Sequence, residues 1–121
     1  MTKAWCIEPT SNNILVREME GSVFQESKKK YNWKLAETIT YTHTNGNNYM
    51  LLMNDLGLYE DTEPNMCATK LLIRLPIHWG VKVLTGNFVI CRFEDNGEET
   101  LYYDMDLTPK EFVAGFKQSR K

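Results

Sequence analysis

Apolar and polar side chains alternate with period two over much of this chain. Within residues 34–43 one alternating set is Leu35, Glu37, Ile39 and Tyr41, and the other is Ala36, Thr38, Thr40 and Thr42, which indicates a strand with two distinct faces. The Asn45-Gly46 pair that follows tolerates the positive backbone angles of a tight hairpin, and Asn96-Gly97 repeats the signal. The sequence therefore predicts local hairpins within a mostly antiparallel sheet. The segments expected to pair are 4–8 with 14–19, 34–43 with 49–53, and 87–93 with 100–103.

Two helix starts are visible between these strand patterns. Ser22 stands three residues before Gln25, an arrangement in which side chains satisfy the free backbone N–H groups of a first turn. We expect a short helix over residues 22–31. Thr108 precedes a proline and lies three residues before Glu111, which is a strong start for a C-terminal helix.

The fold class follows from these elements. Phe112 and Phe116 share one face of the C-terminal helix, so we expect that face to pack on the sheet. The chain reads as a single α+β domain over 1–121, with a mostly antiparallel sheet and two or three short helices, one of them at the C terminus. We expect the helices to lie against one sheet face and residues 118–121 to fray.

Charge and composition narrow the classes of function. Fourteen Lys plus Arg against sixteen Asp plus Glu give a net charge of -2, so the chain has no global basic field to attract a nucleic-acid backbone. Three separated cysteines, outside any C-x-x-C pair, indicate reduced thiols. No apolar run approaches the ~20 residues of a membrane span. We expect a cytoplasmic protein without membrane contact.

Catalytic and metal chemistry find little support in the sequence. His43 and His78 are the two histidines, and neither belongs to a visible catalytic arrangement. A zinc site would have to join them to Cys67 and Cys91 from distant parts of the chain, without the close ligand pairs of structural zinc. We therefore predict a protein that is not an enzyme and that holds no metal or cofactor.

Several short motifs carry a resemblance to a known family. They are Asn54-Asp55-Leu56-Gly57-Leu58, Pro64-Asn65, Ala68-Thr69, Gly86-Asn87-Phe88-Val89-Ile90 and Leu107-Thr108-Pro109-Lys110-Glu111. Together they resemble a small α+β family of unknown function that occurs in phages, plasmids and their Gram-positive hosts. The chain departs from that family at Asn32-Trp33-Lys34, where a Gly-Gly-Tyr-type segment is expected.

The resemblance implies a role in counter-defence within the host cytoplasm. One function that it implies is sequestration of a nucleotide-derived immune signal. The alternative is direct inhibition of a host defence or restriction protein by contact. A sequestering protein acts stoichiometrically, so it must bind its ligand tightly. Tight binding of a small molecule requires an enclosed pocket with convergent polar groups.

Six residues are the candidates for such a ligand site. Asn and Thr side chains can bind a base edge or ribose, Arg can bind phosphate, and Phe can stack on a base. The candidates are Asn65, Thr69, Arg74, Asn87, Phe88 and Arg92. A structural alternative stays open, in which Asn65 caps a short helix beginning near Met66, Phe88 belongs to the core, and both arginines lie on exposed strand faces.

The aromatic content suggests self-association. Three tryptophans and six tyrosines are many for a domain of this size, and we expect some of them to line a symmetric interface. The predicted state is a homo-oligomer.

Overall fold

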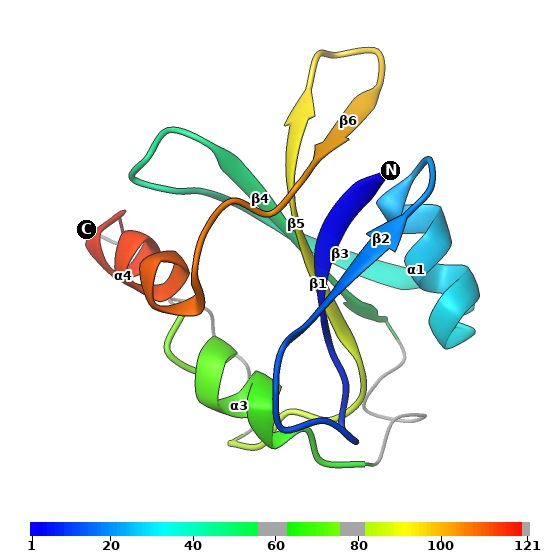
Figure 1. The fold of residues 1–121 in the computed structure, drawn as a ribbon, viewed down its shortest axis with the longest axis vertical. Helices are drawn as coiled ribbons and strands as arrows, with labels where there is room; N and C mark the ends of the chain where they lie inside the picture. The colour runs from blue at the N-terminus through cyan, green and yellow to red at the C-terminus, as the bar shows by residue number, and fades with distance from the viewer. Residues whose placement is uncertain (56–62, 76–81, 120–121) are drawn as a thin grey trace.

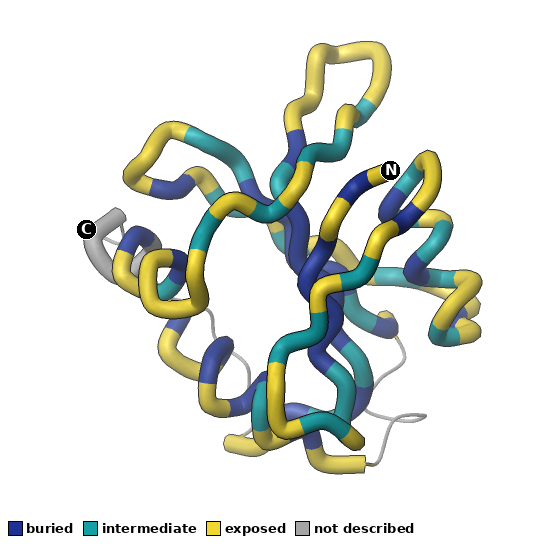
Figure 2. The backbone as a smooth tube through the Cα atoms, in the orientation of Figure 1, coloured by how far each residue is buried: buried dark blue, intermediate teal, exposed yellow. Residues whose placement is uncertain are grey.

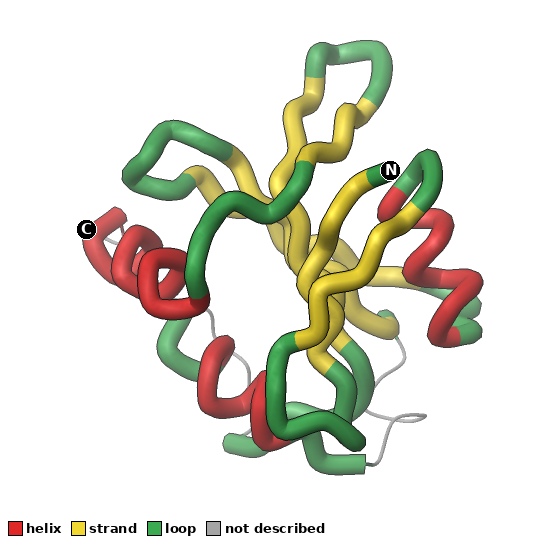
Figure 3. Tube along the Cα trace, in the orientation of Figure 1, coloured by secondary structure: helices red, strands yellow, loops and turns green. Residues whose placement is uncertain are grey.

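The computed structural model describes residues 1–55, 63–75 and 82–119, with the backbone alone over 116–119. Within this part of the chain, six strands form one sheet and three helices pack around it (Figures 1 and 3). In chain order the elements are β1 (Thr2–Ile7), β2 (Leu15–Met19), α1 (Val23–Tyr31), β3 (Ala36–Thr42), β4 (Asn48–Asn54), α3 (Met66–Leu72), β5 (Phe88–Asp95), β6 (Thr100–Tyr103) and α4 (Pro109–Ser119).

Every strand pairing in the described sheet is antiparallel, and the strand order is β2-β1-β5-β4-β3, with β6 pairing the C-terminal half of β5. The three predicted hairpins are present as β1–β2, β3–β4 and β5–β6. Gly46 and Gly97 have φ angles of +89° and +90°, as their turns require. The predicted α+β class, with a mostly antiparallel sheet and a helix near the C terminus, is confirmed.

Both predicted helix starts are confirmed. The Ser22 side chain accepts a hydrogen bond from the Gln25 backbone N–H at 3.2 Å and caps α1. At α4, Thr108 Oγ1 accepts from the Glu111 N–H at 3.2 Å, while Glu111 Oε1 accepts from the Thr108 N–H at 2.9 Å. This reciprocal pair is a complete capping box, and α4 continues from it through Ser119.

The helices cover both faces of the sheet, so the expectation that they share one face is wrong. Figure 1 shows α1 on the side of the sheet opposite α3 and α4. One core cluster joins Trp5 and Ile90 to α3 and α4, and a second joins Cys6 and Val89 to α1. Adjacent residues on a strand point to opposite faces, and the central strands are buried on both (Figure 2).

The C-terminal helix packs on the sheet as predicted. Phe112 is fully buried and makes edge-to-face contacts with Trp5 and Tyr49, with ring centroids 5.5 and 5.9 Å apart. The side chain of Phe116 lies outside the described residues.

No helix in the described part of the chain is long and apolar enough to cross a membrane.

Candidate functional site

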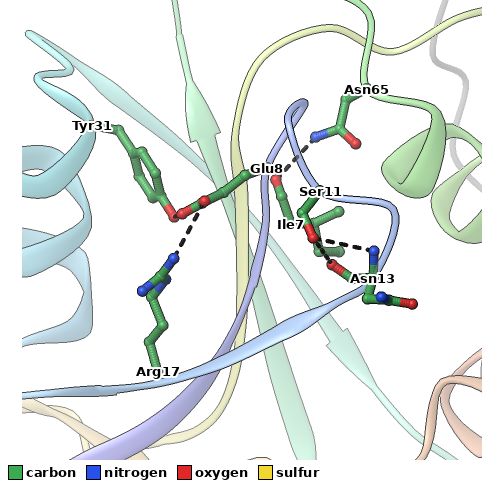
Figure 4. A network of polar contacts seen from close by, with 7 residues as sticks. All are labelled: Ile7, Glu8, Ser11, Asn13, Arg17, Tyr31 and Asn65. Carbon is green, nitrogen blue, oxygen red and sulfur yellow. Dashed lines mark hydrogen bonds and ion pairs between the residues drawn. The ribbon is translucent and has the colours of Figure 1, made fainter.

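Asn65, the first of the candidate ligand residues, lies fully buried where α3 meets the sheet. Its Oδ1 accepts from the Ala68 N–H at 2.9 Å and caps α3. Its Nδ2 donates to the carbonyl of Ile7 at 2.9 Å and to that of Gly86 at 2.7 Å (Figure 4 shows the bond to Ile7). The alternative in which Asn65 caps a helix beginning at Met66 is therefore confirmed. Both amide N–H groups are engaged, so a ligand role would require breaking these bonds.

Thr69 extends the same internal network. Its hydroxyl donates to the Asn65 carbonyl at 2.8 Å and accepts from the Leu84 N–H at 2.9 Å. The Asn65 N–H in turn donates to the Leu84 carbonyl at 2.8 Å. The Asn-x-x-Ala-Thr segment thus attaches α3 to β1 and to the backbone that leads into β5.

Asn87 and Phe88 follow this attachment directly. Gly86 has a φ of +82°, a conformation that glycine adopts without strain, and the chain enters β5 after it. Phe88 is buried in the core on the α3 side, as the structural alternative expected. Asn87 is half-buried at the turn.

Arg92 lies further along β5, away from Asn65. Four residues separate it from Phe88, about 13 Å of strand. Its guanidinium lies 3.9 Å from Asp106 Oδ2 and 5.1 Å from the centroid of the Tyr103 ring. The side chain is partly buried, so the structural alternative is correct in placing it on a strand and wrong in calling that face exposed.

The same carboxylate joins Arg92 to the β3–β4 hairpin. Asp106 accepts from the Tyr49 hydroxyl at 2.7 Å and from Asn47 Nδ2 at 3.3 Å. These contacts hold the segment before α4 over the sheet. The opposite charges of Arg92 and Asp106 are adjacent in this cluster.

Arg74 occupies a different environment from the other candidates. It follows α3 in an exposed turn and not on a strand, which corrects the structural alternative on this point. It lines a groove of about 400 Å³ between α3 and α4. The described residues that line this groove are Lys70, Leu71, Arg74, Pro109, Lys110, Val113 and Ala114.

The groove combines positive charge with an apolar lining. Lys70 and Arg74 are four residues apart, and α4 adds Lys110 across the gap. Leu71 and Val113 supply apolar surface between them, and none of the described lining residues is acidic. Such a site can take an anion that also carries an apolar or planar part.

Lys70 and Lys110 were missed in the sequence. Lys70 and Arg74 are visible in the sequence as two cations four residues apart. No local signal places Lys110 beside them, because that neighbourhood depends on how α3 and α4 pack.

A second hollow, of about 490 Å³, lies between β2 and α1. Its described lining is Val16, Arg17, Glu18, Met19, Glu26 and Lys30, so its charges are mixed.

Arg17, which lines this hollow, also belongs to a small polar network. Glu8 accepts from the Tyr31 hydroxyl at 2.6 Å and from Arg17 at 3.4 Å (Figure 4). Burial, and then the hydrogen bond to Glu8, raise the pKa of the Tyr31 phenol. The hydroxyl therefore keeps its proton at neutral pH and donates this hydrogen bond.

His43 has a structural position. Its Nδ1 accepts from the Asn45 N–H at 3.1 Å, and its Nε2 lies 2.9 Å from the Glu111 carbonyl, which assigns the proton to Nε2. The ring fills the space beside Gly115 on α4. His78 lies outside the described residues. Within the described ranges, no group of three or more His, Cys, Asp or Glu side chains is placed to hold a metal ion.

No protein-family model matches this chain, and neither a curated protein nor a solved structure matches it. The resemblance to a phage-associated family stays a prediction from the sequence motifs.

Proposed function

We propose that this protein binds an anionic, nucleotide-derived small molecule in the groove between α3 and α4 and sequesters it without chemical turnover. The observation that carries the proposal is that Lys70, Arg74 and Lys110 line one groove together with apolar side chains. The phage-related motifs supply the biological setting, namely counter-defence in the host cytoplasm.

The chemistry of the groove suits a phosphorylated ligand. A guanidinium such as that of Arg74 binds phosphate oxygens in a bidentate manner, and the two lysines act as point charges. The apolar side chains of Leu71 and Val113 can receive a base or ribose. The groove has a volume of about 400 Å³ and is open to solvent at its three exposed cations.

The local character of the positive charge favours a small ligand over a polynucleotide. The whole chain has a net charge of -2, so long-range attraction of a nucleic-acid backbone is weak. Sequestration requires a dissociation constant near nanomolar, which corresponds to a binding free energy of about -12 kcal/mol. Charged hydrogen bonds of about 1.5–3 kcal/mol each are the largest single contributions available to it.

A second candidate function is direct inhibition of a host defence protein. Met66 and Ile73 are seven residues apart on the α3 segment, and they are 50% and 40% exposed. Residues at this spacing share one side of a helix, and exposed apolar side chains of this kind can anchor a protein partner.

Calorimetry separates these functions. Wild-type protein is titrated with cyclic dinucleotides, cyclic trinucleotides and cyclic ADP-ribose isomers, beside Arg74→Ala, Lys110→Ala and the control Lys29→Ala. Lys29 is an exposed helical lysine outside the groove. We expect each groove variant to weaken binding about 10- to 100-fold, with the melting temperature and the Lys29→Ala affinity unchanged.

Two outcomes would overturn the proposal. In one, the wild type binds none of the three ligand classes, and direct protein inhibition becomes the leading function. In the other, Lys29→Ala weakens binding as much as Arg74→Ala does, which would place the ligand outside the groove.

A further inference from the structure

The outer edge of β3 pairs with no other strand among the described residues. Among the described residues, β3 ends the sheet and pairs with β4 alone. The bonds from His43 N to Asn47 O (2.9 Å) and from Asp55 N to Leu35 O (3.1 Å) fix the hydrogen-bonded positions of this pair at odd residues of β3. Because hydrogen-bonded and non-hydrogen-bonded pairs alternate in an antiparallel ladder, the backbone groups of the even residues point away from β4.

The side chains of β3 do not protect this edge. Natural sheets block edge pairing with lysine, proline, bulges or very short strands. The seven residues of β3, Ala-Glu-Thr-Ile-Thr-Tyr-Thr, include no lysine, arginine or proline, and Glu37 is their single charge. Thr38, Thr40 and Thr42 are exposed. In the part of the chain that the structure describes, this edge is about 23 Å long, has high β propensity and is paired with no second strand on its outer side.

The strand is complementary to itself in one antiparallel register. If Ile39 lies opposite Ile39 of a second copy, Thr38 faces Thr40 and Ala36 faces Thr42. All four of these even residues carry the outward backbone groups, so the two edges can hydrogen-bond along the strand. Glu37 then faces Tyr41, so no like charges meet, and Thr–Thr is a favourable cross-strand pair.

Strand β2, at the opposite end of the strand order, is less suited to pairing with itself. The symmetric register in which all five of its residues overlap is centred on Arg17 and places two guanidinium groups opposite each other, and a shift to Glu18 places two carboxylates together. Like charges directly opposite each other are destabilising. In the register of full overlap, electrostatic complementarity thus favours β3 over β2.

We propose that two copies of this chain associate through antiparallel pairing of their β3 strands about Ile39, which continues the sheet across a two-fold axis. The proposal gives the expected homo-oligomer a specific interface and does not depend on a ligand in the α3–α4 groove. Tyr41 is the aromatic residue of β3, and the two described tryptophans, Trp5 and Trp33, are buried in the chain itself.

Charge variants at residues 38 and 40 test both the interface and its register. In the proposed dimer, residue 38 of each copy faces residue 40 of the other. Thr38→Lys/Thr40→Glu and the swapped Thr38→Glu/Thr40→Lys create two opposite-charge pairs. Thr38→Lys/Thr40→Lys and Thr38→Glu/Thr40→Glu create two like-charge pairs, and the two sets together control for net charge.

Sedimentation equilibrium from micromolar to millimolar protein gives the readout, with circular dichroism as the check on folding. We expect the wild type and both mixed-charge variants to approach about 28 kDa, twice the 14.1 kDa of one chain. Both like-charge variants should dissociate about tenfold more readily or stay monomeric. A wild type that is monomeric throughout, or like-charge variants that dimerise as the wild type does, would overturn the proposal. Folded mixed-charge variants that are monomeric would exclude this register.

Discussion

Replacing Asn65 with aspartate tests whether the buried amide is structural. The change keeps the shape of the side chain and the acceptor that caps α3 at the Ala68 N–H. It removes both N–H donors, which bond to the carbonyls of Ile7 and Gly86 at 2.9 and 2.7 Å. A carboxylate oxygen would then face two carbonyl oxygens in a fully buried position.

The magnitude follows from these two bonds. Leaving a buried carbonyl without its donor costs about 1–3 kcal/mol, so the pair should cost about 2–6 kcal/mol, and a buried charge adds to this. A domain of this size has a stability of about 5–15 kcal/mol. Asn65→Asp should therefore remove a large fraction of the free energy of unfolding at neutral pH.

The effect should also depend on pH with a definite sign. Burial raises the pKa of the introduced carboxyl in the folded state above its unfolded value of about 3.9. Protonation then favours the folded variant, and a protonated carboxyl regains one donor. The deficit relative to wild type should shrink as pH falls from 7 toward about 4 and grow again as pH rises.

Urea unfolding of both proteins at several pH values measures this deficit. Asn96→Asp is the matched control, because Asn96 is an exposed turn residue whose Oδ1 only accepts, from the N–H groups of Glu98 and Glu99 at 3.0 Å. That variant should stay within about 0.5 kcal/mol of wild type. If Asn65→Asp unfolds at the wild-type urea concentration, or if its deficit is the same at every pH, the reasoning is refuted.

Three further predictions concern the core. Gly115→Ala should destabilise the protein by about 1–3 kcal/mol, because the added methyl overlaps the buried His43 ring, although the same change stabilises most helix interiors. Urea unfolding should show that this penalty disappears when His43 is also replaced by alanine. An equal penalty with and without the His43 ring would contradict the contact. Phe112→Ala should cost about 3–5 kcal/mol in the same assay, since the ring is fully buried; wild-type stability would show that α4 does not contribute to the core. Ellman's reagent should label the half-buried Cys67 first and should label Cys91 only when the protein unfolds. The reason is that burial raises the pKa of the Cys91 thiol to about 12. Simultaneous labelling of the two thiols would contradict this order.

The hairpins and helix starts were predictable because their signals are local. Asn-Gly turns and helix caps act within a few residues. The structure contains both turns and both caps, with the reciprocal capping box complete at Thr108 and Glu111. The covering of both sheet faces was missed, although β5 carries a continuous apolar run, Phe-Val-Ile-Cys, at its start. Such a run is typical of a strand buried on both sides.

The candidate site was harder to predict because it depends on contacts between distant segments. Asn65 bonds to Ile7 and Gly86, which lie 58 and 21 residues away in sequence. Lys110 and Arg74 line the same groove only because α4 packs beside α3. A single sequence without tertiary contacts cannot separate an asparagine that binds a ligand from one that attaches a helix.

The hydrogen bonds of each side chain distinguish a structural residue from a candidate ligand residue. The amide of Asn65 has two donors, and both are occupied inside the protein, whereas Arg74 lies exposed at the edge of a groove. The first side chain places α3, and the second lies on the surface that α3 presents. The two residues should therefore fail in different ways when changed. Asn65→Asp should lose stability whether or not a ligand is present, and Arg74→Ala should lose binding while the free energy of unfolding stays at its wild-type value. The candidate residues that the sequence grouped into one binding site thus have two roles: Asn65 stabilises the fold, and Arg74 lies on the exposed surface beside the groove.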